Sequence, residues 1–258
     1  MFSEGKALAI LKKKIKKPPE TLMILGSGWK SVADLVEERE EISYQELFGV
    51  GTSVPGHVGK LVVGRLGGKT VALMVGRFHL YEGYTAFETT MPIRVLARIG
   101  VKQMIVTAAV GALNPRYKVG DLVILSDLLT LLLQDRPLSG PQFLDMSAVF
   151  DEEMREAAKT VLKKEKVRFW EGVYGYYSGP NFETPTDKKA LRLLGADVVG
   201  MSTVPEVMMG LHLGLKILGL SFVTNLALVK HDHREVLREA ERGSEQMKKV
   251  LAGIVSVV

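Results

Sequence analysis

Residues 71–107 read VALMVGRFHLYEGYTAFETTMPIRVLARIGVKQMIVT and contain two apolar runs separated by a polar loop and a helical pattern. The runs Val71–Val75 and Met104–Thr107 are typical of buried strands. Between them, Thr85–Ile99 has apolar residues at helical spacing. A strand, a helix and a strand in this order are typical of a parallel sheet that helices cover.

The same alternation continues along the chain. Further apolar runs predict strands over Thr21–Leu25, Leu61–Gly64, Leu122–Leu125, Val173–Tyr177, Val198–Met201 and Ile217–Val223. Helical patterns cover Asp151–Lys164, Thr186–Leu194, Val204–Gly214 and Glu235–Val257, and Arg136–Gln142 is predicted to be a long surface loop. We therefore predict an α/β fold, a single domain over residues 1–258 with a central twisted, mixed and largely parallel sheet flanked by helices.

The composition excludes several classes of protein. With 258 residues, 47% hydrophobic and 24% charged, the chain is neither disordered nor collagen-like. Because it has no cysteine, it has no disulfide framework and no thiolate metal site. Six lysines and two glutamates lie in residues 1–20, so this segment holds +4 of the formal net charge of +5. We predict a solvated lysine-rich helix there, and no basic face for nucleic acid.

Membrane and export signals are not recognised in the sequence. The uncharged runs are all shorter than the ~20 apolar residues that a membrane-spanning helix needs. The lysines near the N-terminus are followed by Pro18 and Pro19 without the apolar core of a signal peptide. We expect a soluble, cytoplasmic protein with no membrane partner.

The richest polar cluster follows the predicted strand Val71–Val75. Arg77, His79, Tyr81 and Glu82 lie within six residues at the carboxyl end of that strand, where open α/β sheets bind ligands. The planar fork of Arg77 suits a phosphate, and His79 can add a donor. The alternative is a solvated loop with an Arg–Glu pair.

Two further turns could accept an anion. Ser27 lies between two glycines after the first predicted strand, in a turn that could approach an anion. The turn is not a dinucleotide fingerprint, because Ser31 replaces the third glycine, and it is not a Walker loop. A structural turn is the alternative there. Ser202 lies at the start of a predicted helix, where N–H groups favour an anion, although Thr203 could simply cap that helix.

Two other segments suit a heterocyclic ring. Glu183 could accept from ring N–H groups while Phe182 stacks on the ring, and the alternative is a helix start capped by Thr184. Asn225 at a strand end can both donate and accept. His231 and His233 lack a convincing third ligand, so we predict no metal site. We expect His212 to be a packed core histidine, and spacing alone leaves His57 undecided.

Taken together and in this order, these segments resemble the trimeric purine nucleoside phosphorylases that act on 6-oxopurine nucleosides. The resemblance runs from about Thr21 to the C-terminus. It is carried by the runs V-P-G-H (54–57), G-R-F-H-x-Y-E-G-Y (76–84), G-P-x-F-E-T (179–184) and V-G-M-S-T-V-P-E-V (199–207).

The resemblance implies a reaction and a set of site residues. Inorganic phosphate, as co-substrate, and a purine nucleoside would give ribose 1-phosphate and the free base, in a homotrimer without metal or organic cofactor. Catalytic roles are implied for Asn225, Glu183 and His79. The implied phosphate site comprises Ser27, His57, Arg77, Phe78, His79, the backbone at Ala109 and Ser202; the implied purine and ribose site comprises Tyr81, Phe182, Glu183, Met201, Asn225 and His233.

The chemistry of these residues fits the implied reaction. Negative charge develops on the departing purine, so Asn225 could donate to N7 while Glu183 accepts from N1–H. The related methylthioadenosine phosphorylases, which use 6-aminopurines, have aspartate at this position. Asn225 therefore favours inosine and guanosine over adenosine.

Three departures from the family pattern remain. Ala108 replaces the usual asparagine, the loop before Phe143 is short, and the stretch from Asn225 to His233 is shortened, so His231 could substitute for His233. The alternatives are a methylthioadenosine phosphorylase, a non-catalytic nucleoside binder, and a nucleic-acid-binding protein that uses Lys12–Lys17. The last lacks interleaved aromatics.

Overall fold

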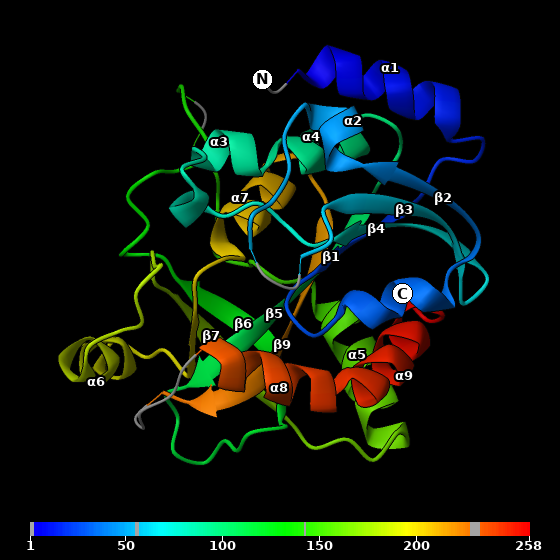
Figure 1. Cartoon of the computed structure of the whole chain (residues 1–258). Coiled ribbons are helices and arrows are strands. Elements are labelled where there is room, and N and C mark those ends of the chain that lie inside the picture. Colours follow the sequence, from blue (N-terminus) through cyan, green and yellow to red (C-terminus); the bar gives the residue numbers. More distant parts are fainter. Residues whose placement is uncertain (1–2, 55–56, 142, 228–232) are drawn as a thin grey trace.

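The computed structural model of the chain describes residues 3–54, 57–141, 143–227 and 233–258, and the side chain of His233 is outside this description (Figure 1). Part of the V-P-G-H run and His231 are also outside it. The strands are β1 (Thr21–Leu25), β2 (Glu37–Ser43), β3 (Lys60–Leu66), β4 (Lys69–Val75), β5 (Gln103–Ala112), β6 (Leu122–Leu129), β7 (Phe169–Tyr176), β8 (Val198–Gly200) and β9 (Lys216–Leu226).

These strands form one mixed sheet in the order β2-β3-β4-β1-β5-β8-β7-β6-β9. The centre is parallel, since β1 pairs with β4 and β5, and β5 pairs with β9. Strands β2, β3 and β4 form an antiparallel edge. Because β9 pairs with both β5 and β6, strands β5 to β9 close into a ring. The predicted mixed sheet of an α/β fold is confirmed. The apolar runs do not indicate that β5 to β9 close into a ring.

Helices cover both faces of the sheet (Figure 1). They are α1 (Glu4–Lys14), α2 (Tyr44–Phe48), α3 (Ala86–Thr89), α4 (Met91–Ala97), α5 (Glu152–Lys164), α6 (Pro185–Leu193), α7 (Val204–His212), α8 (His233–Arg242) and α9 (Ser244–Val255), with a 3₁₀ helix at Lys30–Leu35. Alternate residues of β1 point to opposite faces: Leu22 and Ile24 pack with α1, α2, α4 and α7, while Met23 and Leu25 pack with α5 and α9.

Two predicted helices are each broken in two. The pattern Thr85–Ile99 contains α3 and α4, which meet at Thr90, whose hydroxyl donates to the carbonyl of Ala86. The pattern Glu235–Val257 contains α8 and α9, which meet at Gly243. A Cβ at Gly243 would lie 2.3 Å from the ring of Phe222, so the close approach of strand and helix requires glycine.

The lysine-rich segment is a helix, but it is not merely solvated. Ser3 caps α1, and three of its lysines, Lys12, Lys13 and Lys14, lie in the last turn, where the helix dipole favours cations. Its Ala7 and Leu11 are fully buried in the core, and Glu4 pairs with Arg94 of α4. The helix is therefore docked on the domain. In the described ranges, no helix is long and apolar enough to cross a membrane.

Candidate active site

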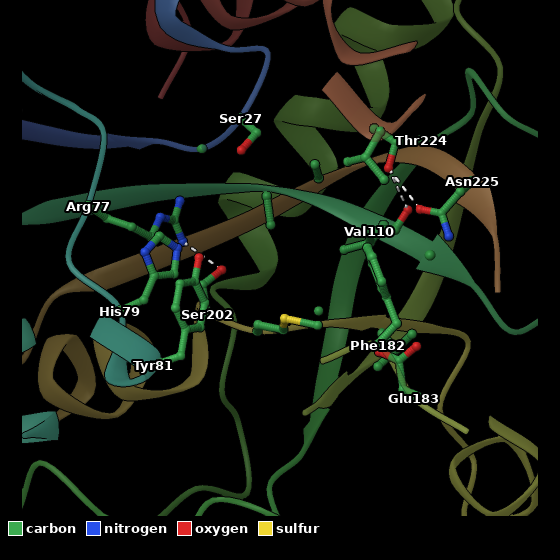
Figure 2. A pocket seen from close by; sticks show the side chains of 18 of the residues that line it. Ser27, Arg77, His79, Tyr81, Val110, Phe182, Glu183, Ser202, Thr224 and Asn225 are labelled. Carbon is green, nitrogen blue, oxygen red and sulfur yellow. Dashed lines mark hydrogen bonds between the residues drawn. The ribbon is translucent and has the colours of Figure 1, made fainter. Parts of the chain in front are cut away.

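One cavity brings together most of the predicted site residues. It lies at the carboxyl ends of the parallel strands β1, β4, β5 and β9, where loops from distant parts of the sequence meet. It is lined by Gly26, Ser27, His57, Arg77, His79, Tyr81, Ala108, Ala109, Val110, Gly111, Phe182, Glu183, Val199, Gly200, Met201, Ser202, Thr224, Asn225 and Val236. Figure 2 shows Arg77, His79 and Ser202 on one side, and Phe182, Glu183 and Asn225 on the other.

Two predicted residues are not among these lining residues. The ring of Phe78 is buried in an aromatic cluster with Tyr44, Phe48 and Tyr84, so the structure does not bring it to the cavity. The side chain of His233 is outside the described part of the chain. The prediction that His212 is a core residue is wrong, because His212 ends α7 and is exposed.

The guanidinium of Arg77 is fixed from three elements. Its Nη2 donates to the carbonyl oxygens of Thr107 in β5 and of Ile24 in β1, the latter at 3.3 Å. Its Nη1 donates to Ser202 Oγ at 3.1 Å. Arg77 is 1% exposed, so the loop is not the solvated one that the sequence allowed. Its ionic partner is Glu206 of α7, at 3.3 Å from Nη1, and not the nearby Glu82.

His57 is a neutral ring held against the backbone of Arg77. Its Nδ1 lies 3.1 Å from the backbone N of Arg77 and 3.2 Å from the carbonyl oxygen. In one tautomer Nδ1 accepts from the backbone N–H and the proton of the neutral ring is on Nε2; in the other, Nδ1 donates to the carbonyl oxygen. Burial, with the charges of His79 and Arg77, lowers the pKa of His57 to about 3.

His79 is oriented by Glu82, three residues later. Its Nδ1 lies 3.1 Å from Glu82 Oε1, and burial lowers the pKa of His79. Glu82 also accepts from the backbone N–H and the hydroxyl of Ser53, at 2.7 and 3.0 Å. Burial alone would raise the pKa of Glu82, but hydrogen bonds from His79 and Ser53 outweigh it and lower this pKa to about 2. Glu82 therefore ties two loops of the cavity together.

Ser202 is presented by a strained turn between β8 and α7. Its backbone N–H donates to the buried Tyr174 hydroxyl at 3.1 Å. Thr203 has a φ of 72°, which is unfavourable for a β-branched residue, and its side chain makes no capping hydrogen bond. Thr203 therefore stands at the N-cap position of α7, as the sequence allowed, but does not cap the helix through its side chain. Its hydroxyl instead lies 3.3 Å from that of Ser202, beside Arg77.

The opposite side of the cavity presents an amide and a carboxylate. Asn225, 7% exposed, accepts from the hydroxyl of Thr224 through Oδ1 at 3.1 Å, which makes Nδ2 the donor of the amide. Glu183 is also 7% exposed, and Phe182 beside it is 37% exposed. Thr184 caps α6 in a capping box with Asp187, so the capping and cavity roles of this segment coexist. Among the described residues, no group of His, Asp and Glu could hold a metal ion.

Residues 20–256 match the model of the Phosphorylase superfamily, and the chain belongs to this family. It is 40% identical to purine nucleoside phosphorylase 1 of Geobacillus stearothermophilus, with 96% of this chain and 95% of the relative covered. It is 36% identical to bovine purine nucleoside phosphorylase, with 93% and 89% covered. The solved structure of Schistosoma mansoni purine nucleoside phosphorylase in complex with inosine is similar, with a TM-score of 0.92, 36% identity and 99% and 96% covered.

The structure adds residues that received no role from the sequence. Glu206 lies within the run V-G-M-S-T-V-P-E-V, yet only the fold shows that it faces Arg77. Thr107 holds the turn before Ser27, because its hydroxyl accepts from the backbone N–H of Gly26 at 3.0 Å. The Tyr174 hydroxyl likewise accepts from the backbone N–H of Ser202, and the Thr224 hydroxyl donates to the side chain of Asn225. A polar residue inside an apolar strand is the signal that could have identified Thr107 and Thr224.

Proposed function

We propose that this chain is a purine nucleoside phosphorylase that cleaves inosine, guanosine and their 2′-deoxy forms with inorganic phosphate. The products are the free purine and ribose 1-phosphate or its deoxy form. One observation carries this proposal: a single cavity holds anion-binding groups at one side and an amide donor with a carboxylate acceptor at the other (Figure 2). The similar proteins that are named purine nucleoside phosphorylases support it.

Phosphate occupies the side of Arg77 and Ser202. The guanidinium supplies the positive charge, Ser202 and Ser27 supply hydroxyls, and His57 donates through Nε2 in the tautomer that carries its proton there. The backbone N–H at Ala109 adds a hydrogen-bond donor to the phosphate side of the cavity. A donor therefore remains there although Ala108 replaces the usual asparagine. His79, whose Nδ1 is engaged by Glu82, turns its other ring nitrogen to the phosphate or to the sugar.

The purine occupies the side of Asn225 and Glu183. As the bond between C1′ and N9 breaks, its electron pair moves to the purine, and a phosphate oxygen forms the new bond to C1′. Asn225 Nδ2 donates to N7 as that atom becomes more basic, and Glu183 accepts from N1–H. Phe182 packs on the base, and Tyr81 and Met201 contact the ribose. His233, or His231 in its place, is proposed for the 5′-hydroxyl from the family resemblance alone. Because methylthioadenosine phosphorylases have aspartate at this position, Asn225 argues against a specificity for 6-aminopurines.

The proposal includes the state of the protein. Phosphate is a co-substrate, and no metal or organic cofactor takes part. Phe143 is 99% exposed and Leu131 68% exposed, and we expect a homotrimer in which a neighbouring subunit covers such apolar side chains. A cytoplasmic location belongs to the same proposal, since a chain without cysteine lacks the disulfide framework that oxidising compartments favour.

The experiment that tests the function compares inosine and methylthioadenosine as substrates, each with phosphate. Release of hypoxanthine from inosine, with little adenine from methylthioadenosine, is the expected result. Preferred release of adenine would assign the chain to the aminopurine branch. No release of base from either substrate would favour a non-catalytic binder.

A further inference from the structure

Arg77 and Glu206 form a buried ion pair beside the proposed phosphate position. Arg77 Nη1 lies 3.3 Å from Glu206 Oε1, and the two side chains are 2% and 5% exposed. Glu206 lies in the first turn of α7, next to the turn that carries Ser202 and Thr203. Removing one partner of a buried pair leaves the other charge without compensation, so the pair couples the charge of Arg77 to Glu206.

The orientation of the Arg77 guanidinium does not depend on Glu206. Neutral oxygen atoms already hold it, namely the carbonyls of Ile24 and Thr107 and the hydroxyl of Ser202. By contrast, Glu206 Oε1 makes no hydrogen bond to any described residue. Its contact with Arg77 is therefore one of charge rather than of directed hydrogen bonding.

The charge balance of the cavity makes this contact important. Arg77 is the one Lys or Arg among the described residues that line the cavity. Burial lowers the pKa of both His57 and His79, so the two rings are neutral at pH 7 when the cavity is empty. Glu206 thus offsets the main fixed positive charge that a phosphate would meet.

We infer that Glu206 tunes the affinity for phosphate downward by offsetting the charge of Arg77. It acts through the charge of Arg77 and does not set the direction of the guanidinium. The consequence is that a sugar phosphate formed at this site can leave, since the pocket holds phosphate less tightly than an uncompensated arginine would. This inference rests on the proposed function, which assigns phosphate to the Arg77 side.

The test is Glu206→Gln, which keeps the shape and removes the charge. Two charges about 12 Å apart at an effective dielectric constant of ~20 interact strongly enough to change a dissociation constant about tenfold, and closer charges change it more. We expect calorimetric titration with inorganic phosphate to show about tenfold tighter binding. As product release slows, kcat decreases and the KM for inosine decreases in proportion, so kcat/KM for inosine stays within about twofold. Glu206→Asp, which restores the charge, returns the phosphate affinity toward that of the unmodified chain. Unchanged or weaker binding of phosphate to Glu206→Gln would overturn the inference.

Folding of the variant is informative as well. Because Glu206→Gln leaves Arg77 buried without a counter-charge, we expect a lower Tm without phosphate and a larger rise in Tm with phosphate than in the unmodified chain. A variant that does not fold even in saturating phosphate would contradict the inference, because phosphate should supply the missing charge. Glu4→Gln is the matched control: it breaks the Glu4–Arg94 pair far from the cavity and should leave phosphate affinity unchanged.

Arg77→Gln separates this inference from the proposed function. If Arg77→Gln does not weaken phosphate binding, the assignment of phosphate to this side fails. If Arg77→Gln weakens binding while Glu206→Gln does not strengthen it, the assignment holds and only the role of Glu206 is lost.

Discussion

The hydroxyl of Ser202 accepts a hydrogen bond from Nη1 of Arg77 at 3.1 Å, although the two residues are separated by 125 positions in the sequence. Arg77 follows β4, and Ser202 follows β8. Their contact joins the open part of the sheet to the ring that closes through β9. The proposed phosphate site therefore depends on the order in which β4, β1, β5 and β8 lie side by side in the sheet.

Replacement of Ser202 tests this relationship. Ser202→Ala removes an acceptor from Arg77 and a donor from the phosphate, and hydrogen bonds to charged groups contribute about 1.5–3 kcal/mol. We expect the KM for phosphate to rise roughly tenfold or more, with little change in the KM for inosine. Steady-state kinetics with each substrate varied in turn checks this. Ser221→Ala is a matched control, since the Ser221 hydroxyl is buried in β9 without a hydrogen bond to any described residue, and it should leave the phosphate KM unchanged.

Replacement of Asn225 tests the base specificity. In Asn225→Asp, a carboxyl group that can deliver a proton to N7 replaces the amide that can only share a hydrogen bond. We expect the ratio of kcat/KM for adenosine to that for inosine to increase. An unchanged ratio, measured with both nucleosides at saturating phosphate, would show that Asn225 does not contact the base as proposed.

The neutral histidines of the cavity make stability depend on pH. Burial, with neighbouring charges, lowers the pKa of His57 from 6.5 to about 3, and burial also lowers that of His79. In the unfolded chain both rings take up a proton near pH 6.5, so stability is complete above this pH and is lost as the pH falls toward the folded values. The His57 ring contributes a loss of up to about 1.4 kcal/mol per pH unit in this window, and His79 adds to the loss in the same direction.

Urea denaturation at pH 7, 6 and 5 without phosphate measures this dependence. Glu82, whose pKa is lowered from 4.5 to about 2, stays ionised in the folded chain over this range and adds only a small loss of stability near pH 5, where its carboxylate begins to take up a proton in the unfolded chain. His57→Gln should remove the part of the pH dependence of the unfolding free energy that comes from the His57 ring. A slope that is the same with and without His57 would mean that this ring is not held neutral by the fold.

The N-terminal helix α1 stabilises the domain without taking part in the cavity. Deleting residues 1–17 removes the buried Ala7 and Leu11, and a Leu→Ala change alone costs about 2–5 kcal/mol in a core. We expect a loss of several kcal/mol in the free energy of unfolding, while kcat at low temperature stays within about twofold. Lys12→Ala, at an exposed position of the same helix, should change stability by less than about 0.5 kcal/mol. A large loss of kcat in the folded deletion variant would show that α1 influences the cavity.

Local patterns predicted the strands that are buried on both faces. The bounds of Thr21–Leu25 agree with β1, because a short, continuously apolar run has one stable placement in the middle of a sheet. Strand β2 was missed, since Glu37–Ser43 lies at the edge and has only Ile42 buried. Its stability comes from pairing with β3, which leaves no apolar signal in the sequence.

The sequence could predict which residues line the cavity, but not which of them contact one another. The resemblance named Arg77, Ser202 and Asn225, which line one cavity. Their roles stay predictions. Glu82 is closer to Arg77 in sequence, but the ionic partner is Glu206, because the fold turns Glu82 toward His79 and Ser53. Such a choice depends on tertiary contacts that no spacing rule contains.

Release of hypoxanthine from inosine, measured with and without inorganic phosphate, tests the proposed phosphorolysis. We expect release that depends on phosphate, with one ribose 1-phosphate formed for each hypoxanthine. Equal release without phosphate would mean hydrolysis by water and would contradict the claim that the Arg77 side of the cavity binds the attacking phosphate.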